Sequence, residues 1–477
     1  MENKKIESVH FIGVGGVGMS GIALVAHDQG MRVSGSDLRE SRYTRQLAEA
    51  GITVYIGQKA ENIFGEGTDD GPDVVVVSTA ILDNNPELIA AKERGLTIIH
   101  RAQMLAYLGV GLDTLAVAGT HGKTTTSSML ASVLDAMGED PTFLIGGIVR
   151  SYGTNAHSGK GRYYVVEADE SDKSFTFLSP AAVLVTNIEA DHLDHYRDLA
   201  EIHEKFACFI GSVPESGVAV VCGEDPKLVE IARGASCKVL TYGFDDSNDY
   251  QVVAYAAEGV GSTFSVKLPS GRVIDSSVPQ NPGRHNVLNA TGVIGMVDAL
   301  GMSADDAAAA LANFRGVKRR FDLVGKCAGV TVVDDYAHHP TEIAATIKAA
   351  SDLGYNKVHV LFQPHRYSRV GLFTEVLRDE FASAFDCADT VTFMDVYSAG
   401  ETPVPGVNGK TFLNVVLDHE GRPADCSFVP HRIDVVDHML ERAGEGDLVI
   451  TMGAGDVTAI GPHLMDGLAK REAEMGR

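Results

Sequence analysis

Residues 119–126, with the sequence GTHGKTTT, combine the residue types of a phosphate-binding loop at a suitable spacing. They follow an apolar run at residues 114–117 and open an amphipathic stretch that continues to Ala136. Small residues let backbone N–H groups approach a triphosphate, a lysine at 123 can reach the β- and γ-phosphates, and the Thr124 hydroxyl can bind Mg²⁺. The segment therefore predicts that ATP is a substrate and that Mg²⁺ accompanies it.

This loop is shorter than the general pattern, which has a glycine five places before the Gly–Lys pair, where Val117 stands. An ordinary strand-to-helix turn remains the alternative. We expect Lys123 to be an exposed loop residue, so that its replacement by alanine would leave the fold intact.

A second glycine loop, GVGGVG at residues 13–18, lies between a strand-like run at 8–12 and a helical pattern at 19–27. Asp37 follows about twenty residues later, as in dinucleotide-binding proteins, so this loop alone predicts a ligand such as NAD. Any diphosphate can use such a helix N-terminus, and a purely structural turn is also open. Because a dehydrogenase has no need of an ATP loop, a UDP-linked substrate is the better interpretation.

Polar residues follow two further strand-like runs. Glu167, Asp169 and Glu170 come after the apolar run at 163–166, and a segment from Asn187 to His192 comes after the run at 182–186. Parallel sheets bind ligands at the carboxyl ends of their strands, so we expect Glu167 beside the phosphate loop as a Mg²⁺ ligand.

Two alternatives remain open for these acidic and imidazole groups. Asp169 and Glu170 could form a solvated loop. His192 is a candidate for a second metal position, although a helix-capping or hydrogen-bonding histidine is the alternative because Mg²⁺ prefers oxygen.

Three more polar clusters end strand-like runs late in the chain, at residues 334–342, 363–369 and 453–456. Arg366 and Arg369 in the second cluster can bind carboxylates or phosphates through two N–H groups each. Surface loops are the alternative for each cluster taken singly.

The whole sequence of 477 residues carries a net charge of −24, which disfavours binding to nucleic acid or to anionic membranes. It has no apolar stretch long enough to cross a membrane and begins without a signal-peptide pattern, so we expect a soluble, cytoplasmic protein. Its six cysteines lack metal-site spacing, and we expect reduced thiols in the core. Nothing in the sequence indicates the oligomeric state.

Strand-like and helix-like segments alternate along the chain, which predicts an α/β protein with parallel sheets covered by helices. Gly30, Gly138 and Gly301 are expected to end helices. Breaks near residues 108–111 and 315–318 predict three domains. These are a Rossmann-like UDP-substrate domain at 1–110, a central P-loop ATPase-like domain with a mostly parallel sheet at 111–316, and a Rossmann-like domain for amino acid and nucleotide at 317–477.

Taken together, these motifs resemble those of the Mur ligase family, and the resemblance spans all three predicted domains. It rests on the two glycine loops and on the following segments: EADESD at 167–172, NIEADH at 187–192, GRHN at 283–286, RRF at 319–321, and the clusters at Asp335, Arg366 and Gly453. The resemblance implies an ATP-dependent ligase of peptidoglycan precursor synthesis, and so of cell wall biogenesis. It would join the lactyl carboxylate of UDP-N-acetylmuramate to L-alanine through an acyl phosphate.

The resemblance also implies roles for individual residues. Those with a catalytic role would be Lys123, Glu167, His192, Arg320 and His338. Those that bind ATP would be Gly119, Thr120, His121, Gly122, Lys123, Thr124, Thr125, Asn187, His285, Asn286 and Asp335. Those that bind the UDP-linked substrate or alanine would be Gly15, Gly16, Val17, Gly18, Arg101, Tyr336, His338, Arg366 and Arg369. The metal ligands would be Thr124, Glu167 and His192.

Two other classes of protein compete with this ligase as interpretations of the sequence. An NAD-linked oxidoreductase would explain the first glycine loop but would leave Lys123, Glu167 and Asn286 without a purpose. A noncatalytic nucleotide switch would explain the ATP loop but not the acids and arginines. Within the family, the ligase that recycles a whole tripeptide differs at residues 363–369, where this chain follows the alanine-adding pattern. The sequence does not discriminate alanine from glycine or serine.

Overall fold

The computed structural model describes residues 5–64, 71–171, 173–190 and 196–475. Their backbone contacts form two compact units. The first unit comprises residues 1–252, 266–274 and 289–311, and the second comprises residues 253–265, 275–288 and 312–477. The predicted domain boundaries at 110 and 316 remain a prediction.

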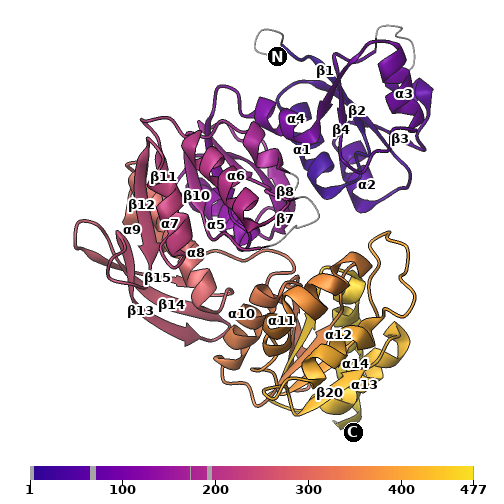
Figure 1. The fold of residues 1–477 in the computed structure, drawn as a ribbon, viewed down its shortest axis with the longest axis vertical. Helices are drawn as coiled ribbons and strands as arrows, with labels where there is room; N and C mark the ends of the chain where they lie inside the picture. The colour runs from indigo at the N-terminus through magenta and orange to yellow at the C-terminus, as the bar shows by residue number, and fades with distance from the viewer. Residues whose placement is uncertain (1–4, 65–70, 172, 191–195, 476–477) are drawn as a thin grey trace. The chain divides into compact units, whose positions relative to one another are not determined.

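The N-terminal sheet has five parallel strands in the order β3-β2-β1-β4-β5, as expected for a Rossmann-like domain (Figure 1). Its strands are β1 Ser8–Ile12, β2 Arg32–Asp37, β3 Thr53–Ile56, β4 Val74–Val77 and β5 Thr97–His100. Its helices are α1 Val17–Asp28, α2 Arg42–Glu49, the 3-10 helix η1 Ala60–Ile63, α3 Pro86–Glu93 and α4 Arg101–Leu108.

The central sheet has ten strands in the order β15-β14-β13-β12-β11-β10-β6-β9-β7-β8. Its strands are β6 Asp113–Ala118, β7 Thr142–Val149, β8 Thr154–His157, β9 Tyr163–Glu167, β10 Ala182–Val185, β11 Val218–Cys222, β12 Lys238–Gly243, β13 Tyr250–Glu258, β14 Gly261–Lys267 and β15 Val273–Val278. Its helices are α5 Lys123–Ala136, η2 Ser174–Phe177, α6 Leu199–Gly211, α7 Pro226–Ala232, α8 Arg284–Ala299 and α9 Ala304–Leu311. The strands from β13 to β7 pair in parallel, and β8 joins β7 antiparallel.

The C-terminal sheet has six strands in the order β16-β17-β21-β18-β19-β20, with only β16 antiparallel to its neighbour. Its strands are β16 Asp322–Cys327, β17 Val330–Asp335, β18 Val358–Phe362, β19 Thr390–Phe393, β20 Asp425–Phe428 and β21 Leu448–Met452. Its helical segments are α10 Pro340–Ser351, η3 Tyr367–Arg369, η4 Leu372–Val376, α11 Arg378–Ser383, α12 Gly409–Leu417, α13 Arg432–Arg442, η5 Asp456–Ala459 and α14 Ile460–Met475. These three sheets confirm the predicted α/β class.

Both faces of the C-terminal sheet are buried, as a parallel sheet between helices requires. Along β17, Val333 joins one apolar cluster and Val332 joins the other, because successive side chains of a strand point to opposite faces. Four phenylalanines of the first cluster, including Phe362 and Phe381, pack edge-on or tilted with centroids 5.4 to 6.4 Å apart.

Local signals in the sequence begin and end these helices. Asn85 and Asp225 cap helices whose first residue is proline. Proline suits this position because the N–H group of the first helical residue has no partner within the helix. The predicted terminating glycines are confirmed, since Gly30, Gly138 and Gly301 have φ of 90°, 84° and 81°.

The structure also bears on the expected absence of a membrane span and on the expected location of the cysteines. None of the helices in the described ranges has the length and apolar character that a membrane span requires. All six cysteines are free. The expectation that they lie in the core is confirmed for Cys222 and Cys237, but Cys327 and Cys426 are only partly buried, and it is wrong for Cys208 and Cys387, which are exposed.

Candidate active site

Three neighbouring parallel strands end at the same edge of the central sheet. In the register of β6 with its neighbours, Val117 pairs with Glu167 of β9, and Ala118 pairs with Val185 of β10. The phosphate loop, the acidic segment and the segment that begins at Thr186 therefore leave the sheet side by side. This is the edge at which parallel sheets bind ligands.

The phosphate loop needs glycine at two positions. Gly119 has φ of 133°, and a Cβ atom there would lie 2.0 Å from Thr186 Oγ1. Gly122 has φ of 87°, and a Cβ atom there would lie 2.9 Å from Asn289 Oδ1. The backbone of the loop therefore lies too close to the segment after β10 and to α8 for a side chain at either position.

Hydrogen bonds from the β10 segment fix the shape of this loop. Asn187 accepts the Thr120 N–H at its backbone oxygen (3.0 Å) and the His121 N–H at Oδ1 (2.8 Å), and it donates from Nδ2 to the His121 carbonyl (3.1 Å). Thr186 Oγ1 donates to the same carbonyl at 2.5 Å. Asn187, expected to contact the nucleotide, thus holds the loop that would bind it.

Helix α5 begins at Lys123 without a side-chain cap from the part of the chain that the structure describes. Its N-cap is Gly122, and Thr125 in its first turn is buried. Uncapped N–H groups and the helix dipole together attract an anion at this end of the helix.

Lys123 is not the exposed loop residue that we expected. Its ammonium donates to the carbonyls of Gly119 (2.6 Å) and Thr120 (3.0 Å), and it contacts both carboxylate oxygens of Glu170 (2.8 and 2.7 Å). Glu170 is 2% exposed, so the solvated-loop alternative is wrong for this residue. The pairing was not predicted, because the sequence left Glu170 open as a solvated acid and Lys123 as an exposed loop residue.

Burial and charge shift the pKa values of this pair. Burial raises the pKa of Glu170 to about 7, in spite of the favourable charge of Lys123. Burial lowers the pKa of Lys123, but Glu170 and Asp169 outweigh it, and the net pKa lies above the usual value. The ammonium is therefore charged at neutral pH.

Thr124 and Glu167 meet as the sequence predicts. The Thr124 hydroxyl donates to Glu167 Oε1 at 2.9 Å, and the Gly146 N–H donates to Oε2 at 2.7 Å. Both side chains offer oxygen, which Mg²⁺ prefers. His192, the third predicted metal ligand, lies outside the described residues.

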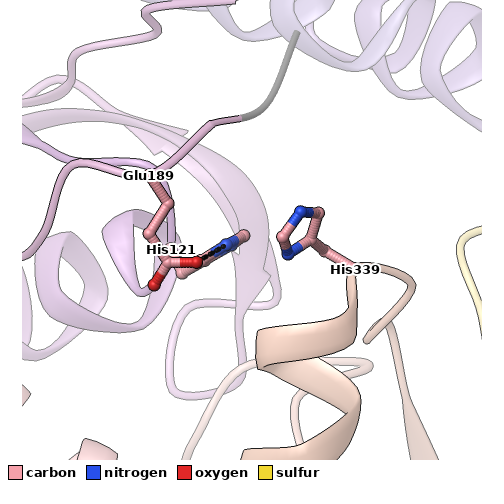
Figure 2. Close-up of side chains that lie close together, drawn as sticks. All are labelled: His121, Glu189 and His339. Atoms are coloured by element: carbon pink, nitrogen blue, oxygen red, sulfur yellow. Dashed lines mark ion pairs between the residues drawn. The ribbon is translucent and has the colours of Figure 1, made fainter. Parts of the chain in front are cut away.

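His121 of the phosphate loop pairs with Glu189, with 3.5 Å between Nε2 and Oε2, as the dashed line in Figure 2 marks. Glu189 is also tied to the loop through its N–H, which donates to Thr120 Oγ1 at 2.8 Å. His339, the third side chain in the figure, is the N-cap residue of α10.

The first glycine loop differs from the expectation for a dinucleotide site. Asp37 accepts the Gly15 N–H at 2.9 Å, and a Cβ atom at Gly15 would lie 2.8 Å from the same carboxylate. A Cβ atom at Gly16 or Gly18 would meet no atom closer than 3.7 Å, so the loop is open there. Val17 follows as the first residue of α1 and is 38% exposed.

Arg101 lies between the first glycine loop and the acidic segment that follows β9. One of its guanidinium nitrogens would lie 3.7 Å from a Cβ atom at Gly18, and another lies 3.3 Å from Asp169 Oδ2. Burial would raise the pKa of Asp169, but Lys123, Ser171 and Arg101 together lower it. Asp169 therefore stays anionic between two cations.

In the second unit, Asp335 is the last residue of β17, and its side chain is buried. It accepts the N–H groups of Phe321 (2.6 Å) and Ala337 (2.8 Å), and burial raises its pKa to about 6. Arg320 lies over the Tyr336 ring, with 5.2 Å from the guanidinium carbon to the ring centre.

His285 and Asn286 lie at the start of α8. Asn286 Nδ2 donates to the Pro282 carbonyl at 2.8 Å and lies 3.0 Å from His285 Nε2. Burial, reinforced by the charge of Arg320, lowers the pKa of His285 to about 4, so its ring is neutral. Gly283 before them has φ of 97°.

The segment after β18 carries Arg366 and Arg369. Arg366 has φ of 67°, and its N–H donates to the Tyr397 carbonyl at 2.8 Å. His365 stacks on Tyr397 at 5.7 Å, and Arg369 lies 6.0 Å from the centre of the Phe373 ring.

Two further polar groups of the second unit, the buried Gln363 and the partly buried Glu342, had no individual role predicted from the sequence. Gln363 binds Asp456 from Nε2 and the Val457 N–H at Oε1, each at 2.9 Å. Glu342 contacts His338 and Arg320. A capping-box pattern, with a glutamate three residues after the N-cap His339, was the available signal for Glu342.

Family models match three consecutive parts of this chain. They are described as the Mur ligase family catalytic domain (residues 8–109), the Mur ligase middle domain (117–297) and the Mur ligase glutamate ligase domain (319–455). A UDP-N-acetylmuramate–L-alanine ligase from Thermobifida fusca is 45% identical over 480 residues, covering 98% of both chains. The chain belongs to the Mur ligase family.

Other similar proteins agree with this assignment. The UDP-N-acetylmuramate–L-alanine ligase of Pelotomaculum thermopropionicum is 44% identical and covers 98% of this Mur ligase and 99% of itself. The crystal structure of UDP-N-acetylmuramate-alanine ligase from Thermotoga maritima matches with a TM-score of 0.79 and 29% identity, over 97% of this chain and 99% of that one. A murein peptide ligase from Psychrobacter arcticus matches with a TM-score of 0.69 and 26% identity over the same shares.

In this Mur ligase, Gly119→Ala should damage the phosphate loop, because its Cβ would overlap Thr186 Oγ1 and its φ suits glycine. We expect the free energy of unfolding to fall by about 2 kcal/mol or more and ATP binding to weaken. Urea unfolding and calorimetric titration measure the two effects. Gly211→Ala is the matched control, since open space surrounds it. Wild-type values for Gly119→Ala would contradict this account of the loop.

Lys123→Ala should destabilise the fold, because it leaves Glu170 buried without its cation. The folded-state pKa of Glu170, already about 7 against an ordinary 4.5, rises further in this variant. Because the pKa of Glu170 is higher in the folded protein than in the unfolded chain, the free energy of unfolding falls as pH rises from the unfolded pKa to the folded pKa. The loss relative to wild type should therefore be larger at about pH 8.5 than at about pH 6, by about 1 kcal/mol or more.

Urea unfolding at both pH values measures this difference. The double variant Lys123→Ala/Glu170→Gln lacks the buried acid and should lose the extra pH dependence. An equal loss for the single variant at both pH values would refute the pairing.

Proposed function

We propose that this Mur ligase uses ATP to join the lactyl carboxylate of UDP-N-acetylmuramate to L-alanine, in the synthesis of peptidoglycan precursors. The observation that carries the proposal is the similarity to UDP-N-acetylmuramate–L-alanine ligases over 98% of the chain, at 45% identity.

The phosphate loop supplies the ATP contacts in this proposal. The N–H groups at the start of α5 and the Lys123 ammonium neutralise the triphosphate, since phosphoryl transfer depends on positioning and charge stabilisation. To bind a phosphate, Lys123 exchanges some of its present contacts for phosphate oxygens. His285, Asn286 and Asp335 are proposed for the adenosine part, from the resemblance to the family.

Thr124 and Glu167 fit Mg²⁺, because two oxygen-bearing side chains lie 2.9 Å apart at the start of the phosphate-binding helix. When bound, the metal would neutralise charge on the phosphates of ATP. His192 remains the proposed contact for a second ion.

The chemistry follows from the poor reactivity of a carboxylate toward amines. A lactyl carboxylate oxygen attacks the γ-phosphorus of ATP, ADP leaves, and an acyl phosphate forms. The alanine amine then attacks the acyl carbon, the carbon–oxygen bond to phosphate breaks, and the amine gives a proton to a base. We assign His338 as that base, Arg320 to the transferred phosphate, and Tyr336, Arg366 and Arg369 to the substrate carboxylates.

The first glycine loop is proposed to hold the UDP part of the acceptor. Gly16 and Gly18 leave open space, Arg101 lies beside them, and α1 begins there without a side-chain cap from the described residues. In this proposal each predicted domain binds a different ligand. The domain at 1–110 binds UDP, the domain at 111–316 binds ATP, and the domain at 317–477 binds the amino acid and part of the nucleotide.

Sustained phosphate release from ATP should require both UDP-N-acetylmuramate and L-alanine, and Lys123→Ala should abolish it. A coupled phosphate assay measures the release, and glycine and serine in place of alanine test the amino-acid preference. Lys227→Ala, which removes an exposed lysine elsewhere in the first unit, is the control and should keep wild-type rates.

Two outcomes would overturn the proposal. Reduction of a nicotinamide without either substrate would favour an oxidoreductase. ATP binding without turnover, in the presence of both substrates, would favour a nucleotide switch.

A further inference from the structure

Glu342 lies in the first turn of α10 and contacts two residues to which the proposed function assigns chemistry. Its Oε2 lies 3.3 Å from His338 Nδ1, and its Oε1 lies 3.6 Å from Arg320 Nη1. Only 13% of its side chain is exposed. The two carboxylate oxygens of this partly buried side chain therefore face two different partners, an imidazole and a guanidinium.

The contacts of His338 determine which of its ring nitrogens carries hydrogen. Nδ1 lies 3.1 Å from the Tyr336 carbonyl oxygen as well as 3.3 Å from Glu342 Oε2. Both neighbours are acceptors, so Nδ1 donates, and the neutral ring keeps its lone pair on Nε2. Edge-on contacts with Tyr336 (5.4 Å) and His365 (6.0 Å) hold the plane of the ring.

Arg320 is oriented by the other side of the same carboxylate. Its guanidinium lies over the Tyr336 ring, and Glu342 Oε1 faces its Nη1 atom. A guanidinium held by a carboxylate and an aromatic face loses little further freedom when it binds an anion.

We propose that Glu342 is a positioning residue for the ligase reaction, orienting His338 and Arg320 together. The inference rests on the proposed function. As the alanine nitrogen bonds to the acyl carbon and phosphate leaves, the amine proton passes to His338 Nε2. Glu342 then faces the Nδ1–H of an imidazolium and stabilises its charge, as a carboxylate does beside a catalytic histidine.

Glu342 also has an ordinary structural role that must be separated from this one. Its carboxylate accepts the N–H groups of His338 (3.2 Å) and His339 (3.4 Å), which completes a capping box at the start of α10. Glutamine serves equally well at this position of a capping box. Glu342→Gln therefore keeps an oxygen for the cap, and it removes the negative charge together with the second acceptor, which faces Arg320.

The test compares Glu342→Gln with Glu380→Gln, an exposed first-turn glutamate of α11 in the same unit. For Glu342→Gln we expect kcat for amide formation to fall about tenfold or more, with the KM for ATP and the thermal unfolding midpoint close to wild type. Glu380→Gln should match wild type in all three. A purely capping role would leave kcat unchanged.

The outcomes separate this inference from the proposed function. Wild-type kcat for Glu342→Gln would overturn the positioning role, provided that wild-type enzyme shows alanine-dependent phosphate release. A fall in the unfolding midpoint that accounts for the lost activity would also overturn it. Absence of that release from the wild-type enzyme would instead overturn the proposed function.

Discussion

The parallel register of β9, β6 and β10 is the constraint on which the site of the first unit depends. It brings three loops to one edge of the central sheet, and Gly119 lets the phosphate loop lie against Thr186 where any Cβ would overlap the threonine hydroxyl. Asn187 then fixes the loop backbone from the β10 side, and Glu167 binds Thr124 from the β9 side. The loop is thus shaped by its neighbours before any nucleotide binds.

Alternating charges extend this arrangement from the phosphate loop to the first glycine loop. Lys123 pairs with Glu170, its field lowers the pKa of Asp169, and Asp169 pairs with Arg101 beside Gly18. In a protein of net charge −24, such local cations are what anionic substrates need. The pairs hold both cations in place within the first unit.

The sequence predicted which strand ends meet at one edge of the sheet, but not every pair of side chains that form there. Strand runs, the terminating glycines and the meeting of Thr124 with Glu167 followed from periodicity and from the geometry of parallel sheets. The burial of Lys123 did not, because a lysine in a loop is usually exposed and Glu170 had the alternative of a solvated loop. Asp37 shows the same limit, since its spacing is typical of a dinucleotide-binding loop and its carboxylate accepts the Gly15 N–H instead.

In the proposed reaction, the acceptor carboxylate is activated by taking the γ-phosphoryl group of ATP. The direct measurement uses UDP-N-acetylmuramate labelled with ¹⁸O in its lactyl carboxylate and mass spectrometry of the phosphate released with L-alanine. The oxygen that attacks phosphorus stays with phosphate when the amine displaces it, so the account predicts phosphate that carries one carboxylate-derived ¹⁸O atom. Unlabelled phosphate, formed together with the amide product, would contradict it.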